Sequence, residues 1–483
     1  MDFWNIIKQI IIIIYFVSII YVAVSTVMEN RNPVKTISWV LVLVLLPIVG
    51  FICYMFFGQN LRKEKIIARK GLKNHDLFYS IAHEQVSHLS ETDMLLNSKF
   101  EEKRRLVTLL LNNSNAVVSA NNSVDVLQNG RCTFDAIIAA IEVAKVYIHL
   151  QYYIFADDAT GRSILNILKR KATEGVEVRM IVDDVGSWEL KRPFFREMWN
   201  AGIQIYSFLP VHFPKLTSKI NYRNHRKIVV VDGITGFLGG LNIADRYARG
   251  TKQFSTWRDT HLRVKGDAVN SLQTIFSIDW YFVSREELND KKYFPHKKAS
   301  GSRVMQIVPS GPDSDWAAIM MGIFHAISCA KRSVLIASPY FMPTEAVLLA
   351  IKTAALSGID VKTILPQRSD SSLTLLSSRS YLRELMEAGV QFYFYQKGFI
   401  HCKTLVIDDF VSIVGSANMD FRSFEQNYEI TAFIYDEKIA AELTATFYDD
   451  LSHCAPVLLD DWNNRPLKEK AKESFARVVS PLM

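Results

Sequence analysis

Two long apolar runs near the start of the chain predict a pair of membrane-spanning helices. Ile10 to Met28 carries no charge before Glu29, and Trp39 to Phe57 is also free of charged residues. Each run has about 19 residues. At about 1.5 Å per residue, a helix of that length spans roughly 28 Å, close to the hydrocarbon thickness of a bilayer. A cleaved signal peptide is the alternative for the first run, which is long for one. We expect a transmembrane hairpin over residues 1–60.

Basic residues around these runs predict which side of the membrane the chain faces. A dense basic flank follows the second run: Arg62, Lys63, Lys65, Arg69, Lys70 and Lys73. Lys8 lies on the same side if the runs form a hairpin, whereas the loop between them carries only Arg31 and Lys35. Because Lys and Arg accumulate in cytoplasmic segments, we expect a multi-pass protein of the cell membrane with its catalytic part on the cytoplasmic side. The flank either binds anionic headgroups or serves only as a topology signal.

After a basic juxtamembrane and helical connector over residues 61–120, short apolar runs alternate with helical segments, and the pattern repeats once. The matching segments are Val124–Asp135 with Val304–Asp315, Ala144–Phe155 with Ala330–Phe341, the stretch from Gly175 with that from Gly358, and the stretch from Ala201 with that from Ala388. Alternating strands and helices predict α/β lobes with a mixed sheet flanked by helices. We expect two duplicated lobes, residues 121–300 and 301–483, packed about a pseudo-twofold axis.

Composition narrows the possible partners and cofactors only in part. The net charge of +7 and the pI of about 8.9 suit either nucleic acid or anionic lipid. The five cysteines are scattered without a C-x-x-C spacing, which argues against a disulfide framework or a zinc site. Because the sequence has no phosphate-binding loop, dinucleotide fingerprint or metal-ligand spacing, we expect no cofactor and no metal.

One eighteen-residue motif occurs twice. The first copy, from His225 to Asn242, reads H-R-K-I-V-V-V-D-G-I-T-G-F-L-G-G-L-N, and the second, from His401 to Asn418, reads H-C-K-T-L-V-I-D-D-F-V-S-I-V-G-S-A-N. The probability that six specified positions agree by chance is roughly 10⁻⁸ per start point, so the repeat is not coincidence. His225 and Lys227 are two residues apart before an apolar run, which predicts that both side chains leave a strand on one face. Asp232 has the opposite parity and is expected to brace the turn.

The doubled motif resembles the HKD signature of the phospholipase D superfamily. The whole chain, including its N-terminal hairpin, is similar to the bacterial cardiolipin synthases of that superfamily. The resemblance implies that each lobe supplies half of one active site. It also implies a catalytic group made of His225, Lys227, Asp232, His401, Lys403 and Asp408. The same superfamily holds hydrolytic phospholipases, phosphatidylserine synthases and nucleases, so the motif alone does not select the reaction.

These residue types suit attack on a phosphodiester. Neutral imidazole provides a lone pair at pH 7, and fixed donors neutralise the phosphoryl oxygens without a metal. The expected donors to those oxygens are Lys227, Lys403, Asn242 and Asn418. The sequence is symmetric about which histidine attacks. Superfamily usage favours His225 as the nucleophile that forms a phosphohistidine, with His401 as the acid that protonates the departing alkoxide.

Each histidine needs a carboxylate to orient its other ring nitrogen. Asp259 and Glu429 are the candidates, because each enters an alternating apolar strand downstream of a motif. The resemblance suggests cross-pairing, in which Glu429 orients His225 and Asp259 orients His401. The alternative is that each acidic residue merely opens a strand.

Two further features are open to more than one interpretation. The stretch Leu209 to Asn224 has no counterpart in the second half, and is either a lid, a loop that dips into the membrane, or an ordinary surface insertion. His75, His83, His149 and His212 lie outside the motifs. We expect them to be core or surface histidines.

A membrane location places the expected site beside phosphatidylglycerol, whose headgroup has a free primary hydroxyl. The resemblance implies a phosphatidyltransferase that condenses two phosphatidylglycerol molecules into cardiolipin and glycerol, with this and other anionic phospholipids as partners. Attack by water would make a phospholipase D, and attack by serine or ethanolamine would make another phosphatidyltransferase. A scaffold with a dead site is disfavoured because no motif residue is lost. A nuclease is disfavoured because DNA cleavage needs no membrane hairpin, so we expect no nucleic acid.

Overall fold

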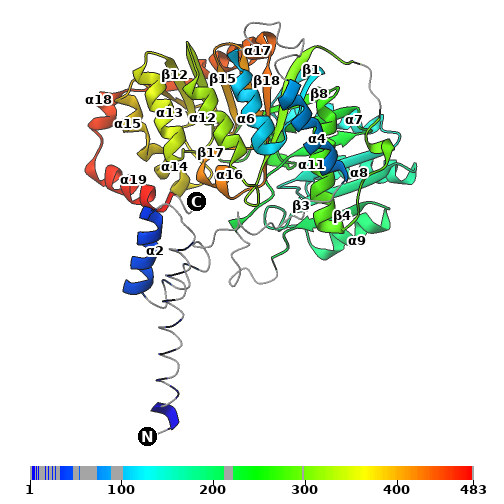
Figure 1. Ribbon diagram of the computed structural model, residues 1–483, viewed down its shortest axis with the longest axis horizontal. Coiled ribbons are helices and arrows are strands. Elements are labelled where there is room, and N and C mark those ends of the chain that lie inside the picture. Colours follow the sequence, from blue (N-terminus) through cyan, green and yellow to red (C-terminus); the bar gives the residue numbers. More distant parts are fainter. Residues whose placement is uncertain are drawn as a thin grey trace. The chain divides into compact units, whose positions relative to one another are not determined.

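The computed structural model describes residues 33–46, 73–88, 102–211, 221–295 and 299–480, with a few single positions among residues 3–54. The chain divides into two compact units (Figure 1). One contains residues 1–64 and 211–221, and the other contains residues 65–210 and 222–483.

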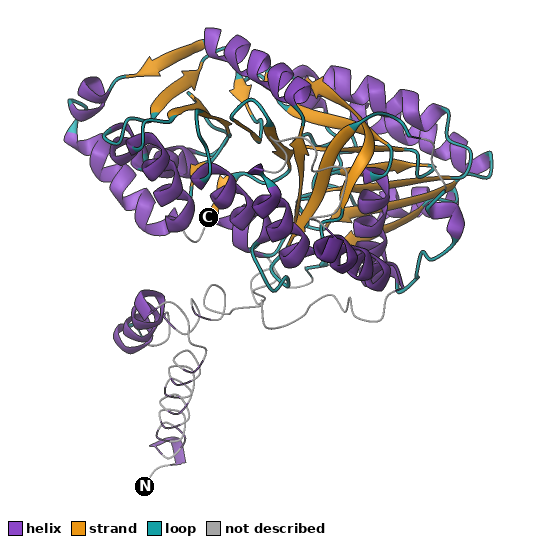
Figure 2. Ribbon diagram, turned by 45° about the horizontal axis from the view of Figure 1, so that its top comes forward, coloured by secondary structure: helices purple, strands orange, loops and turns teal. Residues whose placement is uncertain are grey.

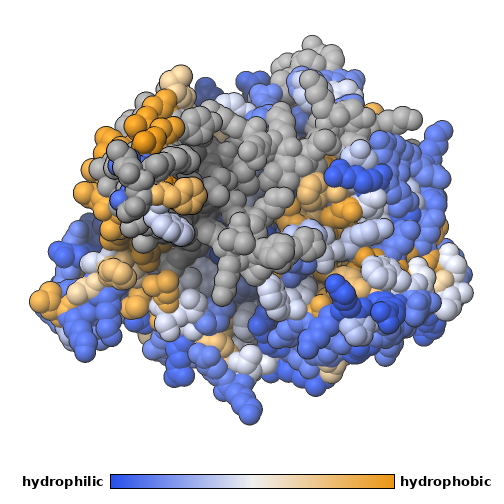
Figure 3. Space-filling model, turned by 90° about the horizontal axis from the view of Figure 1, so that it is seen from below, coloured by the Kyte–Doolittle hydropathy of each residue, from blue (hydrophilic) through white to orange (hydrophobic). Residues whose placement is uncertain are grey.

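The first unit has one described helix, α2 (Pro33–Leu45), which covers the beginning of the second predicted span. Proline suits the first turn of a helix because the amide hydrogen it lacks would have no helical partner there. The exposed side chains of α2 include Ile37, Leu41 and Leu45, and hydrophobic side chains also gather on the face seen in Figure 3. Most of both predicted spans lies outside the described residues. Within the described ranges, no helix combines the length and the apolar character needed to cross a bilayer.

The second unit is built on one sheet that contains both halves of the repeat. The strands of the first half are, in sheet order, β1 (Val118–Gln128), β8 (Thr260–Lys265), β6 (Thr235–Gly239), β5 (Ile228–Val231), β2 (Tyr147–Tyr152), β3 (Glu177–Asp183) and β4 (Gln204–Phe208). Those of the second half are β9 (Arg303–Ser310), β18 (Glu429–Tyr435), β16 (Val411–Gly415), β15 (Thr404–Ile407), β10 (Ser333–Ala337), β12 (Asp360–Pro366), β13 (Gln391–Tyr395) and β19 (Cys454–Val457). The first seven strands of each half follow the same order, which confirms the predicted duplication.

The two halves meet where β1 pairs with β9 in antiparallel fashion. In each half, three strands run parallel (β2, β3 and β4; β10, β12 and β13), and the motif hairpin (β5–β6 or β15–β16) runs antiparallel to its neighbours. The strands β2 and β16 are buried along their whole length, as expected for a sheet covered on both faces. The predicted mixed α/β class is therefore confirmed.

Helices cover both faces of this sheet (Figure 2). The first half contributes α7 (Asn129–Glu142), α8 (Ala159–Thr173), α9 (Arg192–Asn200), α10 (Asp245–Arg249) and α11 (Ala268–Ser284). The second contributes α12 (Ala318–Ser328), α13 (Glu345–Leu356), α14 (Ser372–Ser380), α15 (Leu382–Met386), α16 (Phe421–Glu425), α17 (Glu437–Ser452), α18 (Leu459–Asn463) and α19 (Leu467–Val479). Helices α11 and α17 follow equivalent strands, β8 and β18, and each packs across the sheet. Each half buries its own hydrophobic cluster.

The predicted connector is helical where it is described, as α4 (Lys73–His88) and α6 (Arg104–Ser114). The Gln85 side chain donates to the carbonyl of Val118 at 2.9 Å and accepts from its amide at 2.8 Å, which fixes α4 to the start of β1. Helix α6 buries Leu106, Leu110 and Leu111 in the core of the second half. These two described helices of the connector are thus an integral part of the second unit.

Candidate active site

Short backbone bridges between the halves place each motif histidine against the other half. His225 donates its amide hydrogen to the carbonyl of Tyr428 at 2.9 Å, and Asn224 pairs with Tyr428 as an isolated parallel bridge. In the same way, His401 donates its amide to the carbonyl of Arg258 at 2.7 Å, beside the two-stranded sheet of β14 (Phe399–Ile400) and β7 (Trp257–Arg258). The residue that follows each accepting carbonyl is a carboxylate, Glu429 or Asp259.

These bridges produce the two cross-paired contacts that the resemblance suggested. The Nδ1 atom of His225 lies 2.9 Å from Glu429 Oε1, and that of His401 lies 2.7 Å from Asp259 Oδ2. Since a carboxylate only accepts hydrogen bonds, Nδ1 carries the hydrogen in both rings, and in the neutral form Nε2 holds the free lone pair. Both carboxylates are completely buried. Each histidine therefore has the tautomer that a nucleophile or a base requires.

The two carboxylates occupy equivalent positions although one is a glutamate and the other an aspartate. Gly239 pairs with His261 and Gly415 with Thr431, so Asp259 and Glu429 each stand two residues before a matching partner. The residue after the paired glycine, Gly240 in the first motif and Ser416 in the second, differs together with the length of the carboxylate side chain. Ser416 donates its hydroxyl hydrogen to Glu429, whereas a Cβ on Gly240 would overlap the carboxylate of Asp259.

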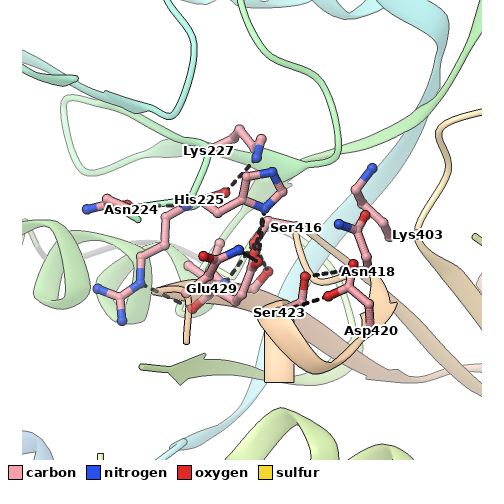
Figure 4. A network of polar contacts seen from close by, with 12 residues as sticks. Asn224, His225, Lys227, Lys403, Ser416, Asn418, Asp420, Ser423 and Glu429 are labelled. Carbon is pink, nitrogen blue, oxygen red and sulfur yellow. Dashed lines mark hydrogen bonds and ion pairs between the residues drawn. The ribbon is translucent and has the colours of Figure 1, made fainter. Parts of the chain in front are cut away.

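The motif lysines hold ammonium groups next to the histidines. Lys227 and Lys403 each donate to the carbonyl of the histidine two residues earlier, at 2.6 Å in both cases. The Lys403 Nζ also lies 2.9 Å from Nδ1 and 3.1 Å from Nε2 of His401. Figure 4 shows Lys403 and Asn418 of the second motif beside His225 and Lys227 of the first, and Lys403 is within electrostatic range of His225. Side chains of the two motifs thus lie together, which is the arrangement that a shared site requires.

Burial controls the ionisation of this cluster. It lowers the pKa of His225 to about 4 against the influence of Glu429, and it lowers the pKa of His401 to about 4 with help from Lys403. Burial also lowers the pKa of both lysines. Burial opposes the charged carboxylates as well, but the neighbouring histidines and lysines outweigh it and lower the pKa of Glu429 and of Asp259. A bound anion would favour the charged lysines and a protonated histidine.

The two motif asparagines differ in what they have available for a phosphate. Asn242 donates its Nδ2 hydrogen to the Tyr247 hydroxyl at 2.9 Å and accepts from the Ile154 amide at 3.1 Å. One Nδ2 hydrogen of Asn242 is therefore directed at Tyr247, and a contact of the second hydrogen with a phosphoryl oxygen stays a prediction. Asn418 keeps a buried Oδ1 without a partner among the described residues, but an amide oxygen only accepts, so the predicted donation from its Nδ2 to a phosphate stays a prediction.

Asp232 and Asp408 are anchors of the sheet, so their expected grouping with the catalytic side chains needs correction. Asp232 follows β5 at the end away from His225, and its carboxylate accepts from the amides of Lys145, Val146 and Tyr147 at 2.8–2.9 Å. Asp408 follows β15 in the same position. Its carboxylate accepts from the amides of Lys331, Arg332 and Ser333 and from the Lys103 ammonium. Both aspartates have positive φ, 52° and 55°, which agrees with the turn-bracing role that their parity predicts.

Two buried arginines, which the sequence did not reveal as functional, hold the backbone carbonyls of the two orienting residues. Arg226 pairs with Asp279 at 2.5 Å and donates to the Glu429 carbonyl at 3.1 Å. Arg258 pairs with Asp450 at 2.8 Å and donates to the Asp259 carbonyl at 2.6 Å. The sequence offered one sign of a special role for Arg226, because the matching position of the second motif is Cys402 and not an arginine.

Aromatic rings surround the two histidines unequally. Among the described residues, Tyr153 alone packs its ring against His225, with centroids 5.0 Å apart. His401 has four aromatic neighbours with centroids within 6.4 Å: Tyr247, Trp257, Tyr340 and Phe399. Tyr153 and Tyr340 lie in the matched segments that end at Phe155 and Phe341. Their place in this repeat is the feature of the sequence that could have indicated a role for either ring.

The remaining sequence features are placed only in part. Residues 212–220 of the expected insertion, together with His212, lie outside the described residues, whereas Arg223 and Asn224 are buried against Asp183. His149 is a core histidine that stacks on Phe276 at 4.4 Å, as expected. Among the described residues, no group of three or more His, Cys, Asp or Glu side chains could hold a metal ion.

Sequence comparison identifies two families along the chain. Residues 137–280 and 323–451 match the family described as "Cardiolipin synthase, PLD-like domain", one segment in each half. Residues 10–59, the segment of the predicted hairpin, match the "Phospholipase_D-nuclease N-terminal" family. Both matches agree with the sequence-based recognition of a duplicated phospholipase D-like chain.

Relatives match the chain over nearly its whole length. A protein named cardiolipin synthase from Geobacillus sp. (strain WCH70) is 40% identical, with 96% of this chain and 92% of the relative covered. A protein of the same name from Listeria monocytogenes serotype 4b is also 40% identical, with 99% and 100% covered. The crystal structure of phosphatidylserine synthase from Haemophilus influenzae shares the fold at 15% identity, with a TM-score of 0.60 over 78% of this chain and all of that one. The chain therefore belongs to the cardiolipin synthase family of phospholipase D-type enzymes.

Proposed function

We propose that this protein is a membrane phosphatidyltransferase that condenses two phosphatidylglycerol molecules into cardiolipin and glycerol. One observation carries the proposal: His225 and His401 each point Nδ1 at a buried carboxylate of the other half, next to two buried lysines. This arrangement suits double displacement at phosphorus, because it provides two histidines and fixed positive charge without a metal.

In the first step, His225 Nε2 attacks the phosphorus of one phosphatidylglycerol. The bond between phosphorus and the glycerol oxygen breaks, and a protonated His401 gives its Nε2 hydrogen to that oxygen, so that glycerol leaves. Glu429 stabilises the positive charge on the phosphohistidine through Nδ1. Lys227, Lys403 and Asn418 are assigned to the phosphoryl oxygens, and the anionic phosphate counters the burial that lowers the pKa of His401.

In the second step, the now neutral His401 takes the proton from the primary hydroxyl of a second phosphatidylglycerol. The resulting oxygen nucleophile attacks phosphorus, the bond to His225 Nε2 breaks, and cardiolipin forms. His401 is again protonated and His225 is again neutral, so the site is ready for another turnover. Asp259 holds His401 in the orientation required for both proton transfers.

The membrane arrangement is part of the same proposal. Residues 1–60 form a transmembrane hairpin, residues 61–120 connect it to lobes at 121–300 and 301–483, and the basic flank keeps these lobes at the cytoplasmic face. Helix α19 supports a position at an anionic surface, because it exposes Leu467, Phe475 and Val478 on a helix that also carries lysines. If reversal of the flank charges left protease accessibility unchanged, this topology would be wrong.

The reaction is tested with the purified full chain in phosphatidylglycerol vesicles, using lipid labelled separately in the acyl chains and in the headgroup glycerol. We expect labelled cardiolipin and free glycerol in equal amounts. His225→Ala is expected to abolish both, whereas His453→Ala, a histidine outside the motifs, serves as the matched control. Phosphatidic acid in place of cardiolipin would instead identify a hydrolase.

A further inference from the structure

Arg246 differs from the arginines behind the active site, each of which pairs with an aspartate. Arg223, Arg226 and Arg258 pair with Asp183, Asp279 and Asp450 at 3.4, 2.5 and 2.8 Å. No carboxylate among the described residues lies within ion-pair distance of Arg246, although Asp370 and Glu189 influence it electrostatically. Arg246 is exposed on α10, which follows the first motif. Its positive charge is therefore available to an anion.

Arg246 is joined to the active site through the hydroxyl of Tyr247. The guanidinium donates to that hydroxyl at 3.2 Å, and Asn242 donates to it at 2.9 Å. With two donors already on the oxygen, the hydroxyl hydrogen of Tyr247 must find an acceptor elsewhere, and the described part of the chain provides none. Tyr247 is 3% exposed, so an unused donor is costly there unless a ligand accepts from it.

The Tyr247 ring lies on the His401 side of the site, and the other half has a serine in place of this tyrosine. The rings of Tyr247 and His401 have centroids 6.3 Å apart. The equivalent positions in the second half are Arg422 and Ser423, which stand 21 and 22 positions after His401, as Arg246 and Tyr247 do after His225. Ser423 accepts from the Asn418 amide at 3.0 Å and so closes a local turn. The two halves therefore share the arginine and differ in the tyrosine hydroxyl, which only the first half supplies.

Cardiolipin formation calls for an anion site on the His401 side, because the second substrate brings a phosphodiester of its own. The donor phosphate lies between the two histidines in the proposed mechanism. The acceptor hydroxyl must approach His401, and a three-carbon glycerol unit connects that hydroxyl to the acceptor's own phosphodiester. That anion must therefore lie close to His401, whereas water or free glycerol brings no anion.

We propose that Arg246 and the Tyr247 hydroxyl bind the phosphodiester of the acceptor lipid and thereby select phosphatidylglycerol over neutral hydroxyl compounds. This inference rests on the proposed phosphatidyl transfer. Arg246 supplies the charge, Tyr247 supplies a directed hydrogen bond, and Asn242 fixes the orientation of Tyr247. Binding energy at a phosphate that does not react is used to position the reacting hydroxyl.

The test compares two acceptors of the same phosphoenzyme. Full-length protein in phosphatidylglycerol vesicles is assayed for cardiolipin formation and, in parallel, for exchange of radiolabelled free glycerol into phosphatidylglycerol. Arg246→Gln and Tyr247→Phe are compared with wild type, with Arg246→Lys, and with Arg249→Gln as a control on an exposed arginine of the same helix. Tyr247→Phe keeps the ring packed and removes only the hydroxyl.

We expect the ratio of cardiolipin formation to glycerol exchange to fall about ten-fold or more in Arg246→Gln and Tyr247→Phe. Arg246→Lys should recover part of the ratio, and Arg249→Gln should keep the wild-type ratio. An unchanged ratio in both variants would overturn the acceptor site, whether the two rates fall together or stay the same. Wild-type protein that exchanges glycerol but forms no cardiolipin would overturn the proposed function itself, and this inference with it.

Discussion

The half-sites at His225 and His401 share their backbone support and differ in their side-chain support. Each histidine donates its amide across the lobes, to Tyr428 or to Arg258. Glu429 is then held by Ser416 and by Asn427 at 3.3 Å, whereas Asp259 accepts from the Thr260 amide at 2.7 Å and lies directly against Gly240. The duplication preserved the positions of the imidazoles while their supporting residues diverged. We therefore expect the two histidines to have separable roles.

The largest effect is expected from removing either imidazole. His225→Ala and His401→Ala should each lower cardiolipin formation about 10⁴-fold or more. The two variants should differ with a phosphatidyl ester of p-nitrophenol, because this leaving group needs no proton. We expect a burst of p-nitrophenol from His401→Ala and none from His225→Ala in stopped-flow absorbance. The reverse pattern would exchange the two roles.

Substitution of the two orienting carboxylates should separate the same two roles, with a smaller loss of turnover. Glu429→Gln and Asp259→Asn are each expected to lower turnover about 10³-fold, because an amide can stabilise the wrong tautomer or orientation of the ring. Only Glu429→Gln should also slow the p-nitrophenol burst. If either variant keeps turnover within a few-fold of wild type, the orienting role of that residue is wrong.

The supports of the carboxylates differ, and two small substitutions probe them. Gly240→Ala places a methyl group where Asp259 lies, so that His401 shifts and turnover falls about 10²-fold. Ser416→Ala removes one hydrogen bond to Glu429 and should cost about ten-fold. Thermal unfolding of both variants provides the control for folding. A larger loss from Ser416→Ala than from Gly240→Ala would contradict this assignment.

The smallest effect at neutral pH is expected in the pH dependence of phosphoenzyme formation. A histidine nucleophile must be neutral, and burial lowers the pKa of His225 to about 4. The acid limb of the burst rate should therefore lie near pH 4, well below the usual histidine pKa of about 6.5. Since Glu429 raises the pKa of His225, Glu429→Gln should move this limb to still lower pH. A limb that stays near pH 6.5 would show that His225 is not buried as described.

The periodicity of the sequence determined most of the fold in advance. Segments that repeat at nearly constant spacing, such as those at Ala144 and Ala330, became equivalent strands in equivalent order, because buried strands retain their apolar pattern after duplication. The two predicted membrane spans rest on composition alone, since most of their residues lie outside the described ranges.

The site was predictable where chemistry depends on local spacing and unpredictable where it depends on contacts between distant segments. The motif separation placed Lys227 beside His225 and Lys403 beside His401. Spacing could not show that Arg226 clamps the carbonyl of Glu429, because about 200 residues of chain separate them. It also could not show that Asn242 is engaged by Tyr247, which follows from how α10 folds back on the motif.

The central claim is that one histidine becomes covalently attached to the phosphatidyl group while the other transfers protons. Full-length protein mixed with acyl-labelled phosphatidylglycerol, quenched in base on the millisecond scale and digested for mass spectrometry, tests this directly. The account predicts a phosphatidyl adduct on His225 that disappears in His225→Ala and decays as cardiolipin appears. An adduct on His401, or rapid cardiolipin formation by His225→Ala, would contradict it.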